Sequence, residues 1–541
     1  MAIIKLLGGV FLAFKIKIMY SLFVLTAVIL VYQLFNIVSD DKIRQAAVGR
    51  GQYVISGVSE YASIYDCNGK RLVNEEYENL AVVDPNSRDS LKILKYVLDK
   101  DAYRSGMNGN LPFLCRVAAE NISDDVIVIK KYNRNSEDQL AIHVLGYTSD
   151  NKGVCGLEYS YDDFLRGCFS ENYVQFSVDA VGEVLEGLNS EIKKAAPLEA
   201  GIVTTLDRDI QQICEDVMGS YNGIKGAVVV MDIKSGEIRA CASYPSLEID
   251  NLEKSLESDD APFVNRAFSA YSVGSIFKLC TAAAALESGI ISDFTYTCTG
   301  SINVNGQIFN CHKWGGHGEI DMYNAMELSC NPYFIALSEY IDSSIFIETA
   351  KSLGFGQETI FADKLTSVSG YLPLRSELSV PAEKGNMSFG QGKLSATPVQ
   401  ICRMTAAIAN NGMCPQPKLV LGIKHTDGNF EKIEYPVNKR AVSYLTAQKL
   451  KEFMVNVVNA ENSFSKSDIV LSAGKTSTAQ TGVITESGRE RLNCWFTGYF
   501  PADFPKYAVT VLVEDGVSGN VTASPIYKKI AEAITENSSV Q

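Results

Sequence analysis

Residues 274–289, GSIFKLCTAAAALESG, begin with a serine and a lysine three positions apart. Positions i and i+3 share one face of a helix, so Ser275 and Lys278 are predicted to be neighbours. The Ala- and Leu-rich run that follows, with Gly289 just past its end, is typical of a helix. Ser275 is then at a helix N-terminus, where backbone amides favour negative charge. This arrangement suits nucleophilic catalysis, but S-x-x-K alone is too common to establish it.

The composition of the chain limits the classes of function. A length of 541 residues predicts two or three domains, and an apolar fraction of 46% with 21% charged residues is ordinary for globular folds. The net charge is −14, and no basic block follows the N-terminal region. The sequence therefore argues against nucleic acid as a partner.

An apolar segment near the N-terminus predicts a membrane anchor. Residues 19–38 carry no charge and are long enough to cross a bilayer as a helix. Lys5, Lys15 and Lys17 precede the segment, so by the positive-inside rule the short N-terminal tail is cytoplasmic and the rest is exported. A cleaved signal peptide is the alternative, but no A-x-A-like site follows promptly. We expect a single-pass protein of the cell membrane, anchored by residues 1–38.

The pattern of short runs predicts an α+β chain. The sequence of residues 39–198 predicts a small, irregular α+β region, and the pattern of apolar and polar runs changes near Glu199. Beyond it, strands are followed by a helical block and then by strands again, which predicts one antiparallel sheet that brackets an all-α insertion, with helices on both faces. The predicted elements are a helix at 208–218, strands at 226–232, 234–240, 468–478, 494–500 and 507–514, and a last helix from Pro525 with Ser524 as its N-cap.

Two further motifs follow the S-x-x-K pair in order. Ser329-Cys330-Asn331 falls between two helical stretches, where short polar side chains are usually caps. Lys475-Thr476-Ser477-Thr478 follows Gly474 on a predicted strand, where an isolated lysine is usually a solvated edge residue. Each motif is weak alone, but S-x-x-K, S-x-N and K-T-(G) in this order are typical of penicillin-binding proteins and serine β-lactamases.

The resemblance extends over most of the chain beyond the anchor. Residues 226–278 resemble the approach to the nucleophile in class B penicillin-binding proteins, and 389–400 resemble their G-Q-G…T-P-x-Q segment. Residues 156–167 and 64–69 are similar to elements of their N-terminal domain, with Cys67 in place of an arginine. This family consists of membrane-anchored peptidoglycan D,D-transpeptidases. The resemblance implies a non-catalytic pedestal or dimerisation-type domain at 39–198 and a penicillin-binding transpeptidase domain of the serine β-lactamase-like fold at 199–541.

The resemblance also implies a reaction, in which a serine acyl-enzyme forms at D-Ala-D-Ala of a stem peptide. Ser275 would attack the carbonyl, with neutral Lys278 as its base, and Ser329 would relay a proton to the leaving nitrogen. Asn331 would hold the donor amide. An amine from a second stem peptide would resolve the ester, with carboxypeptidase hydrolysis as a side reaction. β-Lactams would acylate the same serine.

The third motif would bind the substrate. Lys475 and Thr476 would hold the terminal carboxylate, and Ser477 and Thr478 belong to the same binding strand. The backbone N–H groups of Ser275 and Thr478 would form the oxyanion hole. The family usually has glycine where this chain has Ser477, so we expect a narrowed or locally shifted site with catalysis retained.

A group of cysteines and histidines has two possible interpretations, a zinc site or a disulfide. Cys298, Cys311, His312 and His317 could make a zinc site. The resemblance implies instead a Cys298–Cys311 disulfide that clasps a loop. If this disulfide forms, we expect the chain to need no metal and no cofactor. The thirteen cysteines are odd in number and many sit in apolar runs, so they do not form a dense disulfide framework.

Two other functions stay open. Ser477 could mark a catalytically silent scaffold of the cell-wall synthesis complex, and the same fold also serves β-lactamases. A β-lactam sensor has less support, because the chain has no H-E-x-x-H motif. The region before Glu199 is too short for a glycosyltransferase domain, so we expect a separate glycosyltransferase as a partner.

Overall fold

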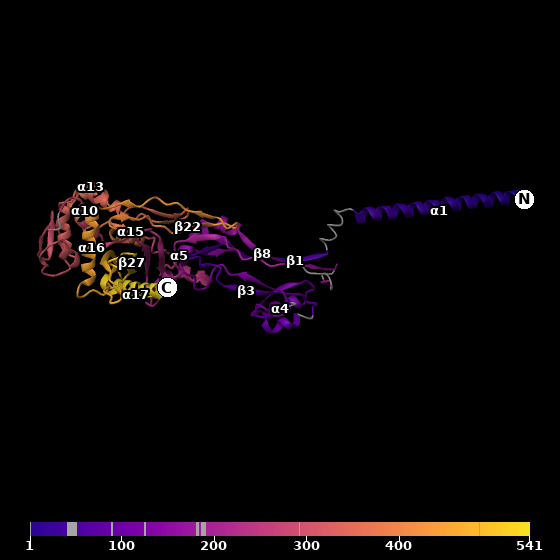
Figure 1. The fold of residues 1–541 in the computed structure, drawn as a ribbon, viewed down its shortest axis with the longest axis horizontal. Helices are drawn as coiled ribbons and strands as arrows, with labels where there is room; N and C mark the ends of the chain where they lie inside the picture. The colour runs from indigo at the N-terminus through magenta and orange to yellow at the C-terminus, as the bar shows by residue number, and fades with distance from the viewer. Residues whose placement is uncertain are drawn as a thin grey trace. The chain divides into compact units, whose positions relative to one another are not determined.

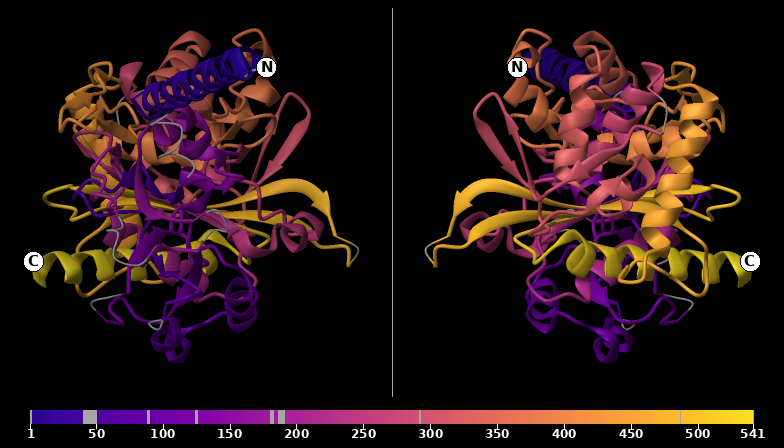
Figure 2. Two further views of the ribbon diagram at one scale, coloured as in Figure 1. Left: turned by 90° about the vertical axis from the view of Figure 1, so that its right-hand side faces the viewer. Right: turned by 90° about the vertical axis from the view of Figure 1, so that its left-hand side faces the viewer.

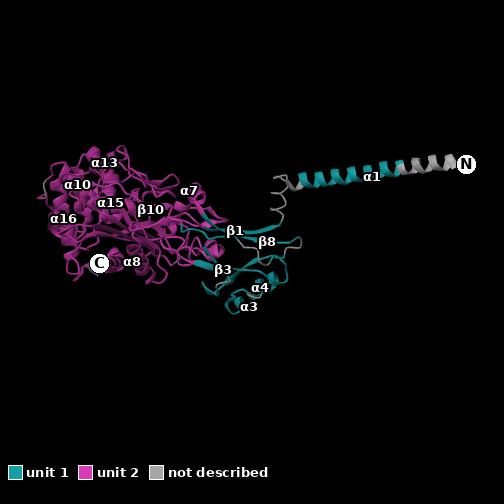
Figure 3. Cartoon of the chain, turned by 45° about the vertical axis from the view of Figure 1, so that its right-hand side comes forward, with its two compact units in different colours: residues 1–59, 77–131, 170–197 teal, residues 60–76, 132–169, 198–541 magenta. Residues whose placement is uncertain are grey.

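The structure is a computed structural model, and the chain divides into two compact units (Figure 3). Unit 1 comprises residues 1–59, 77–131 and 170–197, and unit 2 comprises 60–76, 132–169 and 198–541. Residues 60–76 and 132–169, which the sequence analysis assigned to the N-terminal region, therefore belong by their contacts to unit 2. The described residues are 2–39, 51–87, 90–123, 126–179, 183–185, 191–290, 293–485 and 487–540.

The first helix, α1 (Ala2–Ser39), contains the predicted membrane span (Figure 1). Within it, Phe14–Asn36 is apolar enough and long enough to cross a bilayer, and none of this segment is buried against the rest of the protein. The apolar helix predicted at 19–38 is confirmed.

Unit 1 is a small α+β body. Its strands form two three-stranded sheets, ordered β4-β3-β5 and β1-β8-β9. Helix α4 (Lys100–Met107) begins after Asp99, whose carboxylate accepts hydrogen bonds from two amides of the first turn. The strands are β1 (Gln52–Tyr61), β3 (Tyr77–Val83), β4 (Phe113–Val117), β5 (Val128–Tyr132), β8 (Phe169–Ser177) and β9 (Glu191–Lys193), and a short helix is α3 (Ser90–Ile93).

Unit 2 is built on an antiparallel sheet that includes β27 (Figure 1), and its C-terminal strands are the long gold arrows of Figure 2. The sheet has five strands in the order β12-β11-β27-β26-β25. Strand β25 is at one edge, which leaves its outer side free to face the helical insertion. The strands are β11 (Gly226–Asp232), β12 (Ile238–Tyr244), β25 (Ala473–Ile484), β26 (Glu490–Phe500) and β27 (Tyr507–Glu514). The predicted antiparallel sheet is confirmed, although β12 lies at Ile238–Tyr244 where residues 234–240 were predicted, and β25 begins five residues later than predicted.

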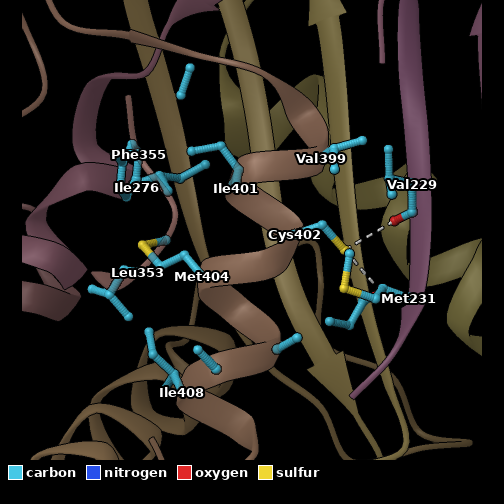
Figure 4. Close-up of a cluster of buried hydrophobic side chains, with 14 of the residues drawn as sticks. Val229, Met231, Ile276, Leu353, Phe355, Val399, Ile401, Cys402, Met404 and Ile408 are labelled. Carbon is cyan, nitrogen blue, oxygen red and sulfur yellow. Dashed lines mark hydrogen bonds between the residues drawn. The ribbon is translucent and has the colours of Figure 1, made fainter. Parts of the chain in front are cut away.

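Both faces of this sheet are covered by helices, because its strands are apolar on both sides. Along β11, Val229 and Met231 pack into the core around α15 (Pro398–Ala409) (Figure 4). Val228 and Val230 pack on the opposite face, against α8 (Arg208–Gly219) and α17 (Ser524–Val540). Period-two alternation explains the division. Helix α15 is buried at every residue, and its few polar side chains, such as Gln400 and Arg403, are buried with hydrogen-bond partners.

The helical insertion lies between β12 and β25. Its helices are α9 (Leu252–Glu257), α10 (Lys278–Glu287), α11 (Met322–Glu327), α12 (Asn331–Glu339), α13 (Ser343–Ser352), α14 (Pro381–Ser388), α15 and α16 (Tyr444–Asn459). It also contains two-stranded sheets, formed by β14 (Tyr296–Cys298) with β17 (Gly318–Ile320), β15 (Ser301–Val304) with β16 (Gln307–Asn310), β18 (Thr359–Ala362) with β19 (Leu365–Ser367), and β13 (Tyr271–Ser272) with β20 (Ser395–Ala396). The insertion is thus mainly helical with short two-stranded sheets, where an all-α insertion was expected.

The remaining sheets of unit 2 are smaller. One has four strands in the order β2-β10-β22-β23, with β2 parallel to β10. Its strands are β2 (Ser63–Tyr65), β10 (Gly201–Thr204), β22 (Val420–Lys424) and β23 (Phe430–Lys432). The other elements are α5 (Ile142–Leu145), α6 (Gly156–Ser160), α7 (Asp162–Gly167), the pair β6 (Thr148–Ser149) and β7 (Lys152–Gly153), and the pair β21 (Met413–Cys414) and β24 (Lys439–Arg440).

The predicted start of the last helix is wrong. Ser524 is already helical, because a π-helical turn at Gly519–Ala523 precedes it. The residue that caps this turn is Ser518, whose side chain accepts a hydrogen bond from the Val521 amide. The Ser-Pro signal therefore marked the point where the π-helical turn becomes an α-helix.

We expect the packing of α15 against the sheet to dominate the stability of unit 2. Ile401 has no exposed surface and packs in the core that also contains Ile276, the residue after Ser275 (Figure 4). Ile401→Ala should lower the free energy of unfolding by about 2 to 5 kcal/mol, because it leaves a cavity. Denaturant unfolding followed by the fluorescence of buried Trp495 measures this. Val437→Ala, at a position 79% exposed, is the control, and an equal effect of both substitutions would contradict the prediction.

Candidate active site

The S-x-x-K pair lies at the start of a buried helix. A 3-10 turn, η3 (Gly274–Phe277), leads directly into α10, which ends before Gly289 at a φ of +77°. Ser275 is partly exposed, whereas the Lys278 side chain is fully buried. The predicted helix is confirmed from Lys278 onward, and Ser275 precedes it in the 3-10 turn as a partly exposed residue.

The S-x-N motif forms the turn between α11 and α12 and surrounds the amine of Lys278. Ser329 adopts a left-handed conformation with a φ of +51°, which few residues other than glycine tolerate. Lys278 Nζ donates to the Ser329 carbonyl at 2.6 Å and to Asn331 Oδ1 at 2.7 Å. Ser329 Oγ lies 3.1 Å from the same nitrogen. The turn thus supplies three oxygen atoms to one buried lysine.

The third motif reaches the same hydroxyl from the edge of the sheet. Lys475 Nζ donates to Ser329 Oγ at 3.2 Å and to the Thr476 carbonyl at 3.1 Å. Lys475 is 1% exposed. The structure therefore brings Lys278, Ser329, Asn331 and Lys475 into one hydrogen-bonded cluster, from three segments that are far apart in the sequence.

The η3 turn, which carries Ser275, lies directly against the strand that carries Lys475. A Cβ atom on Gly274 would lie 2.4 Å from Ser477 Oγ and 3.0 Å from Ala479 Cβ. The Gly274 amide donates to the Gly390 carbonyl at 2.8 Å, within the predicted G-Q-G segment. The residue before Ser275 must therefore be glycine, both for its φ of +63° and for this close approach.

Burial sets the charge of the two lysines. Desolvation lowers the pKa of Lys278 well below its ordinary value, and the positive charge of Lys475 lowers it further. Burial also lowers the pKa of Lys475, to about 7. The cluster can therefore hold one neutral amine beside one ammonium group near neutral pH.

The side chains of the K-T-S-T strand alternate in exposure. Thr476 is partly exposed and Thr478 is exposed, whereas Ser477 is 3% exposed. Thr478 Oγ1 accepts a hydrogen bond from the Gly519 amide at 3.0 Å. The hydroxyl of Ser477 donates to the Val273 carbonyl at 2.8 Å, so this side chain points into the protein instead of toward a ligand.

A cluster of thiols lies behind the S-x-N turn. Potential ligand atoms of Cys298, Cys311, His317 and Cys330 lie within 4.8 Å of one another, and Cys311 Sγ is 3.5 Å from His317 Nδ1. Cys298 and Cys311 are free thiols, so the structure does not contain the disulfide that the resemblance implied. Three thiols and an imidazole are the ligands of structural zinc sites, in which sulfur atoms lie about 3.8 Å apart at tetrahedral geometry. The residues thus fit Zn²⁺ with small movements.

Several residues of the site were missed by the sequence analysis. Cys330 belongs to the thiol cluster where His312 was expected, and its position inside the S-x-N motif was the available signal. Glu514 accepts hydrogen bonds from Arg266 Nε and from the Tyr271 hydroxyl, each at 2.8 Å, and holds the segment before Ser275. No local pattern could reveal this contact, because Glu514 is more than two hundred residues away in the chain.

This fold and this arrangement of motifs define the penicillin-binding class of proteins. Residues 226–532, more than half of the chain, match the family described as "Penicillin binding protein transpeptidase domain". The chain belongs to this family.

Curated relatives and solved structures agree with this assignment. The chain is 31% identical over 413 residues to stage V sporulation protein D of Bacillus subtilis, a match that covers 72% of this chain and 61% of that protein. It is 29% identical to the peptidoglycan D,D-transpeptidase PbpA of Mycobacterium tuberculosis over 62% of this chain and 73% of that protein. A ceftriaxone acyl-enzyme complex of penicillin-binding protein A from M. tuberculosis shares the fold, with a TM-score of 0.63 at 23% identity over 88% of this chain and 98% of that one.

The thiol cluster predicts that the purified protein binds zinc. We expect about one Zn²⁺ per chain by elemental mass spectrometry, because thiolate and imidazole ligands at this spacing suit tetrahedral coordination. Cys330→Ser should lower the zinc content and the melting temperature together, whereas Cys155→Ser, at an exposed thiol outside the cluster, should change neither. A wild-type protein that stays free of zinc after incubation with the metal would contradict the prediction.

Proposed function

We propose that this chain is a D,D-transpeptidase that cross-links peptidoglycan stem peptides through an acyl-enzyme on Ser275, and that β-lactams acylate the same serine. The names of its relatives support the reaction class. The observation that carries the proposal is the Ser329 hydroxyl, which lies within hydrogen-bond distance of two buried lysine nitrogens.

Lys278 is the proposed base for the attack. A neutral amine has two N–H groups and one lone pair. The Ser329 carbonyl and Asn331 Oδ1 only accept hydrogen bonds, so they use both N–H groups of neutral Lys278. The lone pair is then left for a hydroxyl proton, and burial keeps this neutral form accessible.

Ser329 is the proposed proton relay. As an ammonium group, Lys475 donates a hydrogen bond to Ser329 Oγ. The Ser329 hydroxyl proton is therefore available for a hydrogen bond to a different acceptor. Ser275 attacks the carbonyl carbon between the last two D-alanines, its proton passes to Lys278, and a C–N bond breaks. The proton then passes through Ser329 to the leaving nitrogen.

The remaining residues are assigned to binding and charge stabilisation. Asn331 holds the donor amide, and Lys475 with Thr476 binds the terminal carboxylate. The amides of Ser275 and Thr478 stabilise the oxyanion, an effect worth about 3 to 4 kcal/mol per donor in similar sites. An amine of a second stem peptide resolves the ester, and water in its place gives the carboxypeptidase side reaction.

The location follows from the apolar helix. We assign the N-terminal tail to the cytoplasm and the transpeptidase domain to the outside, on the basis of Lys5, Lys15 and Lys17 before the span. Peptidoglycan strands must be polymerised before they are cross-linked, which supports a glycosyltransferase as the partner.

Labelling with a fluorescent penicillin tests the nucleophile. The full-length protein should form a stable adduct, and Ser275→Ala should abolish it, because no other hydroxyl takes the place of the nucleophile. Ser288→Ala, a partly buried serine at the C-terminal end of the same helix, is the matched control and should label normally. Intact-mass spectrometry should show one added drug per chain. A wild-type protein that never labels would favour the scaffold reading, and rapid release of hydrolysed drug would favour a β-lactamase.

The pH dependence of acylation tests the two lysines. The rate constant kacyl/Kd should rise with pH as Lys278 becomes neutral, because its pKa is lowered by burial. It should fall above a pH of about 7, because Lys475 loses the positive charge that binds the carboxylate. Lys475→Arg keeps its charge at every pH. The residual kacyl/Kd of this variant should therefore not decrease above a pH of about 7. If the decrease persists in Lys475→Arg, a group other than Lys475 causes it.

A further inference from the structure

Ser477 joins the two halves of the site through a buried hydrogen bond. The residue lies on β25 between Thr476 and Thr478, but its side chain is buried and its hydroxyl donates to the Val273 carbonyl at 2.8 Å. Val273 is the residue from which the η3 turn begins, two positions before Ser275. The bond therefore connects the strand of the third motif with the turn that carries the nucleophile.

The space around Ser477 allows little movement. On one side its Oγ would be 2.4 Å from a Cβ atom on Gly274. On the other side its backbone carbonyl would be 2.2 Å from a Cβ atom on Gly519. Both neighbours are glycines, and each accommodates the close approach because it lacks a side chain. The hydroxyl is thus held in one position.

The Ser477 bond is one of several that fix the segment before Ser275. The Ser272 carbonyl accepts from Trp495 Nε1 at 3.0 Å, and the Gly274 amide donates to the Gly390 carbonyl at 2.8 Å. Of these bonds, only that of Ser477 comes from the strand that carries Thr478. It alone ties the turn directly to the peptide unit that is assigned to the oxyanion hole.

We propose that Ser477 is a positioning residue, which sets the spacing between the backbone amides of Ser275 and Thr478 without touching the substrate. The inference rests on the proposed function, since it assigns a role within the same acylation step. Preorganised donors act only when they are aimed at the position of the developing charge, and small displacements cost large factors in rate. This account replaces the expectation that Ser477 narrows the binding strand, because its side chain faces away from the exposed threonine.

Stopped-flow acylation of the full-length protein by a chromogenic β-lactam tests this role. Ser477→Ala removes the hydroxyl with little change in volume. We expect the acylation rate constant to fall about tenfold, while the dissociation constant of the pre-acylation complex changes less than twofold. The matched control is Thr481→Ala, which removes a hydroxyl-to-carbonyl bond of 2.8 Å on the exposed part of the same strand. This control should acylate at the wild-type rate.

The outcomes separate positioning from stability. A purely structural role for Ser477 would lower the melting temperature and leave the acylation rate of the folded protein unchanged, and that result would overturn the inference. An equal loss of acylation rate in Thr481→Ala would overturn the inference as well, because the effect would then not be specific to the hydroxyl of Ser477. If the wild-type protein shows no Ser275-dependent acylation, the proposed function fails, and the inference fails with it.

Discussion

Two lysine side chains are buried around one serine hydroxyl, and much of unit 2 serves to hold them there. Burying an ammonium group without partners is costly, so each nitrogen needs acceptors and a lowered pKa. The S-x-N turn gives Lys278 a carbonyl and an amide oxygen, and the strand gives Lys475 the carbonyl of the following residue. Their mutual repulsion helps to keep Lys278 neutral, which is the state that a base requires.

The turn at Ser329 is the element on which this cluster depends. Its left-handed backbone directs both a carbonyl and a hydroxyl toward the lysines. Such a conformation persists only where the surroundings enforce it. Pro332 in the first turn of α12 and the thiol of Cys330 next to Ser329 supply two such constraints. The thiol cluster therefore lies where it can stabilise the geometry of the proposed relay.

Packed elements also hold the segment that carries Ser275, the proposed nucleophile. Helix α15 is buried against the central sheet and packs in the same core as Ile276, and the segment before Ser275 is pinned from β25, from β26 and from the glycine-rich stretch at Gly390. The family assignment and the shared fold agree with such a scaffold, in which chemistry is placed at the edge of a sheet. The candidate catalytic groups come from a helix, a turn and a strand, so none of these elements could form the site alone.

Local patterns in the sequence determined the elements and the order of the motifs. Helical spacing predicted Ser275 above Lys278, and the apolar runs predicted β27 at its observed ends and the helices on both faces of the sheet. The tertiary structure alone decided that Ser477 points inward and that residues 60–76 and 132–169 belong to unit 2. It also decided that Cys298 and Cys311 are free thiols in one cluster with His317 and Cys330, where a Cys298–Cys311 disulfide was expected. The physical reason is that periodicity reports which face of an element is buried, whereas the neighbour on that face is set by packing between segments that are distant in the chain.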